Sequence, residues 1–245
     1  MFKKILLLIL ISAVVILTLS FFTNKKEVEA PTNPVVENPI PETITLCFYK
    51  ETPPNEIGLS DVAWLKMNLT GDKVTGEFRN LPAEKDSKVG TFEGVVGTVD
   101  KYAMARTADV WWDSMAEGMT VKEELRIVFG EGTAQAGFSE MVDRGDGVYV
   151  YKDKENIGYW QEMTDVSCDD LDDRVFVEKY IRANIKTLAP EQPTLGGTWY
   201  VTKVKVDYLK KTGTFSYEDG HMAESATFSY TRNGENVLVK DIKKI

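Results

Sequence analysis

After residue 42, apolar and polar residues alternate along most of the chain, and glycine-containing turns separate the alternating runs. Alternation with a period of two places every second side chain on the same face of a β-strand. Such runs flank the Gly71-Asp72 turn, so residues 61–80 are predicted to form a β-hairpin. The same pattern on both sides of residues 130–132 predicts a second hairpin over residues 125–138.

Further short strands are predicted in the same part of the chain. They occupy residues 43–49, 90–99, 109–115, 148–151 and 159–166. Repeated glycines in residues 90–99 indicate β-bulges or a close approach of two backbones. Consecutive short antiparallel strands joined by turns are typical of a meander that curls into a small barrel or sandwich, which is the fold predicted for residues 43–168.

A helical periodicity follows the strands. Leu171, Val175, Ile181 and Ile185 recur at helical spacing behind a cluster of aspartates, so an amphipathic helix is predicted over residues 169–188. The aspartates lack the glycine and the distal glutamate of a calcium-binding EF-hand loop, and their carboxylates are expected to stabilise the N-terminus of the helix.

Four more strand-like runs follow a linker that contains proline and glycine. They predict a C-terminal four-stranded meander over residues 195–245, with hairpin turns at Asp219-Gly220 and Asn233-Gly234. A meander of this length has a thin core. It is therefore expected to pack against the helix or the first module.

The beginning of the chain is apolar. An uncharged run of 18 residues, 5–22, follows Lys3-Lys4 and as a helix would be about 27 Å long, close to the thickness of the hydrocarbon layer of a bilayer. Residues 1–26 are therefore predicted to be an uncleaved transmembrane anchor, with the C-terminal body outside the cytoplasm. Secretion after cleavage near Ala30 is the alternative. Residues 27–42 contain four prolines and predict an extended tether.

Composition excludes several kinds of function. The chain has 29 basic and 38 acidic residues, and without the four lysines and two glutamates of residues 1–30 it keeps 25 and 36, a net charge of −11. Such an acidic body repels phosphate backbones, so nucleic acid is not an expected partner. A single histidine, His221, excludes metal sites with two or three imidazoles, and no metal ion or cofactor is expected.

The sequence contains two cysteines, Cys47 and Cys168. In an exported protein two cysteines most often pair, so a disulfide is predicted, with two buried free thiols as the alternative. The bridge would close a loop of roughly 120 residues, which by the chain-entropy argument stabilises the fold by up to about 4 kcal/mol.

Three carboxylates in turns near glycines are the candidates for catalysis: Glu84, Asp86 and Glu117. If their turns share one rim of a curled sheet, a protonated acid and an ionised partner could hydrolyse a glycosidic bond. The opposing interpretation, which we favour, is that Glu84-Lys85-Asp86 is a structural turn whose charges satisfy backbone N–H groups and each other.

Trp111 and Trp112 are the candidate binding residues. Adjacent residues of a regular strand point to opposite faces of the sheet. One of the two is therefore expected to be exposed, where its ring could stack on a sugar, a peptide or an apolar ligand, whereas aromatic residues in strands more often belong to the core.

The first module also carries short motifs: Cys47-Phe48-Tyr49, Val74-x-Gly76-x-Phe78, Glu84-Lys85-Asp86, Gly90-Thr91-Phe92-x-Gly94, Glu117-Gly118-Met119 and Glu123-Glu124. Together, over residues 46–141, they resemble uncharacterised bacterial cell-envelope lipoproteins, chiefly known from Bacteroidetes. The resemblance implies an exported, anchored β domain and supplies no activity and no catalytic residue. This chain differs in having an apolar run in place of a lipidated cysteine, and residues 169–245 lie outside the resemblance.

These features predict a mainly β, membrane-tethered extracytoplasmic protein that binds a ligand or a protein partner in the cell envelope and is not an enzyme. A glycosidase-like envelope hydrolase that uses Glu84, Asp86 and Glu117 is the alternative. A structural or assembly role is a third interpretation, which the sequence does not separate from the first.

Overall fold

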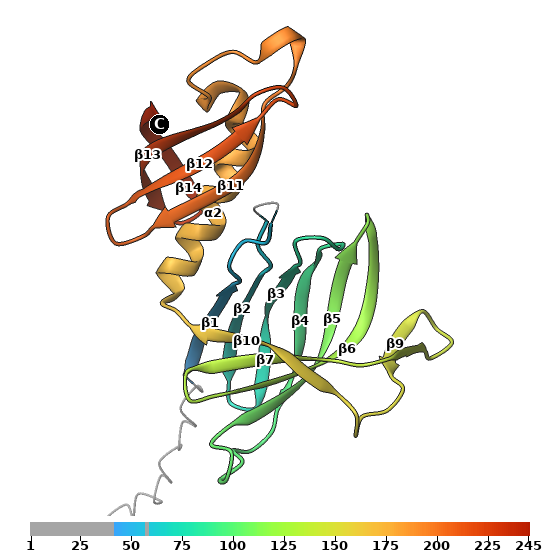
Figure 1. Cartoon of the computed structure of the whole chain (residues 1–245). Coiled ribbons are helices and arrows are strands. Elements are labelled where there is room, and N and C mark those ends of the chain that lie inside the picture. The colour runs from blue at the N-terminus through green and yellow to red at the C-terminus, as the bar shows by residue number, and fades with distance from the viewer. Residues whose placement is uncertain (1–41, 57–58) are drawn as a thin grey trace, which may run out of the picture. The chain divides into compact units, whose positions relative to one another are not determined.

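The computed structural model describes residues 42–56 and 59–245 (Figure 1). Among these residues there is no helix of the length and apolar character that crossing a bilayer requires. The predicted anchor, residues 1–26, and the predicted tether up to residue 41 lie outside the described part of the chain.

The first module is a closed barrel of eight antiparallel strands (Figure 1). The order around the barrel is β5-β4-β3-β2-β1-β10-β7-β6, and the pairing of β5 with β6 closes it. The bounds are β1 (Thr43–Glu51), β2 (Val62–Thr70), β3 (Lys73–Leu81), β4 (Lys88–Val96), β5 (Arg106–Ala116), β6 (Met119–Gly130), β7 (Thr133–Phe138) and β10 (Gly158–Asp165). Two short strands, β8 (Met141–Asp143) and β9 (Val148–Tyr151), extend the sheet beyond β6.

Both predicted hairpins are confirmed, because β2 pairs with β3 and β6 with β7. Strands β5 and β6 are longer than predicted and meet at a tight turn. In this turn Glu117 has a φ of 51° and Gly118 a φ of 78°. Positive φ at both central residues is the geometry of a type I′ turn, whose twist matches the twist of the strands that it joins.

The glycines of β4 allow close backbone contact. Strand β4 pairs with β3 and β5 without a register shift, so the expected bulge is absent from these two pairings. A Cβ atom at Gly94 would collide with the backbone carbonyl of Asp109 on β5. The close approach predicted from the glycines is therefore the correct alternative at this position.

Inward-facing side chains fill most of the barrel. Alternate residues of β2, β5 and β6 point inward, as the period of two requires. The core consists of Phe48, Ala63, Leu65, Met67, Leu69, Val74, Phe78, Phe92, Val96, Ala108, Val110, Trp112, Leu125, Ile127, Phe129, Ala134, Ala136 and Met163. An eight-stranded barrel is just narrow enough for side chains to fill its interior in this way.

Helix α2 (Cys168–Leu188) follows β10 and confirms the predicted helix. Ser167 caps it, because its hydroxyl oxygen accepts a hydrogen bond of 3.1 Å from the backbone N–H of Asp170. One end of the helix packs on the outer surface of the barrel, where Leu171 contacts Trp64 and Cys47. Cys47 and Cys168 confirm the predicted pairing, with sulfur atoms 2.17 Å apart and Cα atoms 5.2 Å apart.

The C-terminal part is the predicted four-stranded meander. Its strands pair in sequence order and are β11 (Tyr200–Asp207), β12 (Thr212–Glu218), β13 (Ala223–Asn233) and β14 (Asn236–Lys244), preceded by the short helix η1 (Thr194–Gly196). Its core includes Trp199, Phe215 and Phe228 together with Val177 and Ile181 of α2. The expectation that this meander packs against the helix is confirmed.

A buried aspartate joins α2 to this sheet. Asp173 is 0% exposed, and its carboxylate accepts hydrogen bonds from Lys211, Tyr230 and Arg232. Its neighbours in the cluster also form ion pairs: Asp170 with Arg174, Asp172 with Lys66, and Asp169 with Arg232, which Asp169 shares with Asp173. Stabilisation of the helix N-terminus is thus an incomplete explanation of the aspartates, because Asp172 and Asp173 bind residues of the barrel and of the C-terminal sheet.

The contacts of Asp173 predict an acid-sensitive contribution to stability. Burial alone raises the pKa of this carboxyl group, but the hydrogen bonds from Lys211, Tyr230 and Arg232 outweigh burial and hold the pKa below its usual range. A carboxyl group whose pKa is lower in the folded state stabilises the fold above its unfolded pKa of about 3.9. That contribution is lost as the pH falls through the folded-state value.

We therefore expect Asp173→Asn to lower the free energy of unfolding at pH 7 by about 3 kcal/mol, the cost of breaking a buried ion pair. Urea unfolding at several pH values is the measurement. The variant should also lose less stability than the wild type between pH 5 and the acid limit of the experiment. An identical loss in both proteins would contradict this role of Asp173.

Candidate functional site

Three connections lie at one end of the barrel, which we call the mouth. Glu51 pairs with Val62 and Val62 with Leu81, so the β1–β2 and β3–β4 connections share this end. Val89 pairs with Met115, which places the β5–β6 turn there too. The carboxylate-bearing turns that the sequence singled out are therefore at the same rim, as expected.

The inward-facing residues change character at the mouth. Deeper in the barrel they are apolar, but near the mouth six strands contribute polar or charged side chains. This polar belt consists of Lys50 on β1, Asn80 on β3, Lys88 on β4, Ser114 on β5, Glu123 on β6 and Gln161 on β10. A packed barrel core does not require polar residues, so the belt is the first place to look for a binding site.

A cavity of about 690 Å³ opens at the mouth beside part of the belt. Its walls come from the β1–β2 and β3–β4 connections and from the inward-facing Asn80, Phe138 and Gln161. The Gln161 amide nitrogen donates a hydrogen bond of 2.9 Å to the Asn80 side-chain oxygen. The volume lies within the range of small-molecule pockets, and the mouths of β-barrels are common places for them.

Buried polar atoms at this end lack partners. The side-chain oxygen of Gln161 and the hydroxyl of Ser60 are buried, and neither has a hydrogen-bond partner among the described residues. Lys50 borders a smaller cavity of about 180 Å³ that shares Gln161 and Asp61 with the larger one, and it forms no ion pair or hydrogen bond with a described residue. Unpaired buried polar groups cost about 1–3 kcal/mol each, so a ligand that bonds to Gln161, which lines both cavities, would recover free energy.

The remaining part of the belt is internally paired. The Lys88 ammonium lies 2.6 Å from the Glu123 carboxylate, which also accepts a hydrogen bond of 2.7 Å from the Ser114 hydroxyl. The same ammonium lies 5.4 Å from the centre of the Trp112 ring. Glu123 is only 7% exposed, so its charge depends on these partners.

The three predicted carboxylates are not brought into one cavity. Glu84 lines the mouth cavity and accepts a hydrogen bond of 2.7 Å from the Asn55 side-chain amide. Asp86 and Glu117 are exposed and line neither mouth cavity. The second carboxylate in the mouth is Asp61, which accepts a hydrogen bond of 2.7 Å from the backbone N–H of Ala83.

The two tryptophans face opposite sides of β5, as the alternation predicted. Trp112 is 1% exposed inside the barrel and offers no surface to a ligand in solvent. Trp111 is half-buried on the outer face, where the Arg144 guanidinium lies 5.7 Å from the centre of its ring. Neither ring lines the mouth cavity.

Sequence reasoning missed the belt, although a signal was present. In β5 the inward row runs Val110, Trp112, Ser114, and in β6 it runs Glu123, Leu125, Ile127. A polar residue at the end of an otherwise apolar row marks an inward position near an open barrel end. That inference requires the strand limits and the direction of each side chain, which the sequence alone left open.

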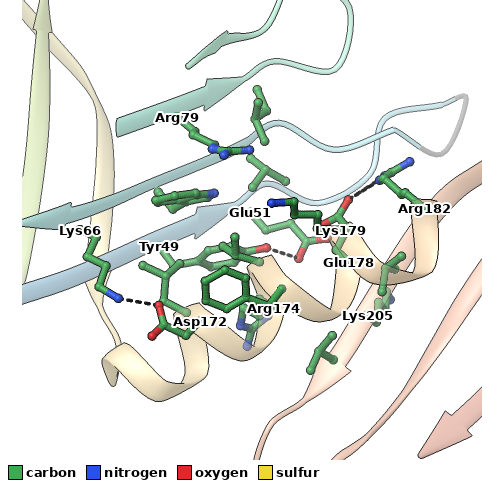
Figure 2. Close-up of a pocket in the computed structure, with 18 of the residues that line it drawn as sticks. Tyr49, Glu51, Lys66, Arg79, Asp172, Arg174, Glu178, Lys179, Arg182 and Lys205 are labelled. Atoms are coloured by element: carbon green, nitrogen blue, oxygen red, sulfur yellow. Dashed lines mark hydrogen bonds and ion pairs between the residues drawn. The ribbon is translucent and has the colours of Figure 1, made fainter. Parts of the chain in front are cut away.

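A second, larger hollow of about 1410 Å³ lies between the outer faces of β1–β3, helix α2 and the C-terminal sheet. Figure 2 shows that some of its charged residues face one another. Lys66 pairs with Asp172 at 2.7 Å and Arg182 with Glu178 at 2.7 Å. Arg174 stacks 4.8 Å from the centre of the Tyr49 ring, and burial of that ring raises the pKa of its hydroxyl.

The Lys66–Asp172 pair and the Arg174–Tyr49 contact connect helix and barrel, whereas Arg182 and Glu178 both belong to α2, and these contacts leave few unpaired polar groups for a ligand. Of the cations that line the hollow, Lys179 and Lys205 have no ion pair with a described residue. The mouth is the better candidate site because its unpaired polar atoms are buried, where a missing hydrogen bond costs most.

Comparison of the chain with protein-family models, with curated proteins and with solved structures finds no match. A function therefore has to be argued from the residues and geometry of the chain itself. The resemblance to envelope lipoproteins stays a prediction.

The Lys88–Glu123 pair predicts an asymmetric response to substitution. Lys88→Met leaves a buried carboxylate without its counter-ion and should lower the free energy of unfolding by about 2–3 kcal/mol, somewhat less than for a fully buried pair because the lysine side chain is 34% exposed. Glu123→Gln should cost less, since the released ammonium can turn to solvent. Urea denaturation of both variants is the measurement, and the opposite ranking would contradict the buried pair.

Proposed function

We propose that this chain is a membrane-tethered extracytoplasmic β protein that binds a small polar ligand in the mouth of its barrel. The observation that carries the proposal is the polar belt beside an open cavity, in which the Gln161 side-chain oxygen is buried without a partner. The same cavity offers the apolar ring of Phe138 beside the polar groups. An apolar wall with a few convergent polar groups is the usual composition of a binding site.

The location outside the cytoplasm has two supports. The apolar run of residues 5–22 and the proline-containing residues 27–42 read as an anchor and a tether. Cys47 and Cys168 lie at disulfide distance, and disulfides persist in oxidising compartments. The resemblance of residues 46–141 to envelope lipoproteins points the same way.

An envelope hydrolase that uses paired carboxylates is the second candidate. The observation in its favour is that Glu84 and Asp61 line the same cavity. The hydrolase predicted from the sequence used Glu84, Asp86 and Glu117. Since Asp86 and Glu117 do not line that cavity, Asp61 takes the place of the second carboxylate in this candidate. Both cavity carboxylates already accept hydrogen bonds from neighbouring groups, which is also the arrangement of a structural turn.

The binding proposal predicts two variants that lose ligand without losing the fold. Gln161→Leu and Lys50→Met each remove a belt side chain's polar atoms at similar volume, so the free energy of unfolding, measured by urea denaturation, should stay within about 1 kcal/mol of the wild type or rise. Binding of N-acetylglucosamine oligosaccharides or soluble muropeptides, followed by saturation-transfer NMR, should fall at least tenfold. Lys179→Met, in the hollow beside α2, is the matched control and should bind normally.

Loss of binding in Lys179→Met, with normal binding in both mouth variants, would move the ligand to the hollow and contradict the proposal.

The hydrolase candidate makes a different prediction with the same glycans. Turnover should disappear in Glu84→Gln and persist in Glu117→Gln, because only the first residue lines the cavity. Chromatography of the glycan products is the measurement, and circular dichroism verifies that both variants fold. Absence of turnover by the wild type, or turnover that survives Glu84→Gln, excludes a mechanism through this carboxylate.

A further inference from the structure

The β4–β5 connection and the adjoining end of β4 present apolar side chains to solvent at the end of the barrel opposite the mouth. Tyr102 is fully exposed, and Val95, Val99 and Met104 are each more than half exposed. None of the four belongs to a core cluster of the described residues or packs against one. We call these four residues the apolar tip. Since they do not stabilise the fold by burial, their exposure requires another explanation.

Hydrogen bonds within the β4–β5 loop fix the conformation of the segment that carries the apolar tip. The Asp100 carboxylate accepts hydrogen bonds from the backbone N–H groups of Tyr102, at 2.8 Å, and Ala103, at 3.1 Å, and the Asp100 N–H bonds to the Ala105 carbonyl at 2.8 Å. Met104 has a φ of 48°, in the left-handed region that non-glycine residues rarely adopt. These bonds hold Tyr102 and Met104 away from the barrel. The exposure of the tip is thus built into the loop.

Strand register places the tip at the end where the chain enters the barrel. Thr43, the first residue of β1, pairs with Thr70, and Lys73 of the next strand pairs with Val95. Thr70 and Lys73 pair with each other, so Thr43 and Val95 lie in one row across four strands. With strands about 4.8 Å apart, these two residues are about 14 Å apart along the sheet. Figure 1 shows the beginning of β1 and the β4–β5 connection at the same end of the barrel.

This placement indicates which surface the apolar tip contacts. The residues that precede Thr43 include the apolar run 5–22, followed by the tether 27–42. A flexible tether of this length has a root-mean-square span of about 22 Å, so an anchored chain keeps this end of the barrel near the bilayer. Such confinement raises the local concentration of the tip at the surface, and a weak contact then suffices.

The chemistry of the tip fits the interfacial layer of a bilayer. Tyrosine is enriched at membrane–water interfaces, where its ring is shielded and its hydroxyl stays hydrated. The polar residues of the loop include one acid and one base, Asp100 and Lys101, so the loop itself carries no net charge. The contact therefore does not depend on anionic lipid, which the acidic body would repel.

We infer that the apolar tip inserts into the headgroup layer of the membrane that anchors the chain, and so turns the mouth of the barrel away from that membrane. The inference rests on the membrane tether of the proposed function and adds an orientation to it. Nine-residue strands span about 20–30 Å when tilted in a barrel, so the mouth would be held that far from the lipid surface.

The test uses the full chain in phosphatidylcholine liposomes that contain a lipid with a nitroxide near the headgroup. An environment-sensitive fluorophore is attached at Tyr102→Cys or, as the matched control, at Met119→Cys, which lies at the mouth and is 64% exposed. Quenching by the nitroxide lipid should be at least threefold greater at position 102. The paired Cys47 and Cys168 do not compete for the label.

A triple variant separates the tip from the tether. With the label at Lys101→Cys, the substitutions Val99→Ser, Tyr102→Ser and Met104→Ser should reduce quenching to the level of position 119, while flotation with liposomes and the urea midpoint stay unchanged. Quenching that survives these substitutions would overturn the inference, because the tether alone would then explain it.

Three further outcomes would each overturn the inference, and the first two show whether the membrane tether fails with it. If the chain does not float with the liposomes, the membrane tether is wrong, and the inference is overturned with it. If the chain floats and positions 102 and 119 are quenched equally, the inference alone is overturned. Energy transfer between labels at position 102 that rises with protein density would also overturn it, since a second copy of the chain would then cover the tip.

Discussion

The pairing of β10 with both of its neighbours, which completes the ring of strands, is the interaction on which the rest of the described structure depends. Strand β10 pairs with β1 on one side and with β7 on the other, and its pairing with β1 joins residues more than 100 positions apart, such as Phe48 and Asp165. Without these pairings β1 and β7 would be unprotected edges, which proteins avoid. Because α2 begins shortly after β10 and Cys168 is joined to Cys47 of β1, the closure also determines where the helix starts.

Closure gives the barrel two chemically different ends. The inward rows of the strands are apolar in the body of the barrel and polar at the mouth, where Lys88 and Glu123 neutralise each other but the Gln161 oxygen has no partner. At the other end, apolar residues such as Tyr102 and Met104 point away from the core. Both features cost free energy: the buried polar groups at the mouth lose their hydration, and the apolar residues at the tip stay exposed to water. Such costs are most often retained where a protein binds something.

Helix α2 shows how one cluster of identical residues can serve several contacts. Asp170 and Asp173 are buried, whereas Asp172 faces the barrel, and the partners of the three come from the helix, the C-terminal sheet and β2. A buried carboxylate is tolerated only when donors surround it, and Lys211, Tyr230 and Arg232 do so for Asp173. The helix is thereby attached to both of its neighbours through polar contacts as well as through packing.

The sequence by itself determined the local structure. The alternation around the Gly71-Asp72 turn, the helical spacing that begins at Leu171 and the final four runs each correspond to observed elements, because strand and helix periods are properties of consecutive residues. The pairing of Cys47 with Cys168 also followed from composition and context. Only the tertiary structure decided that Ser114, Glu123 and Gln161 face inward at one end, that Trp112 is buried and that Glu84 lines the mouth cavity while Asp86 and Glu117 do not. Those facts depend on strand register and barrel closure, which are set by contacts between residues far apart in the chain.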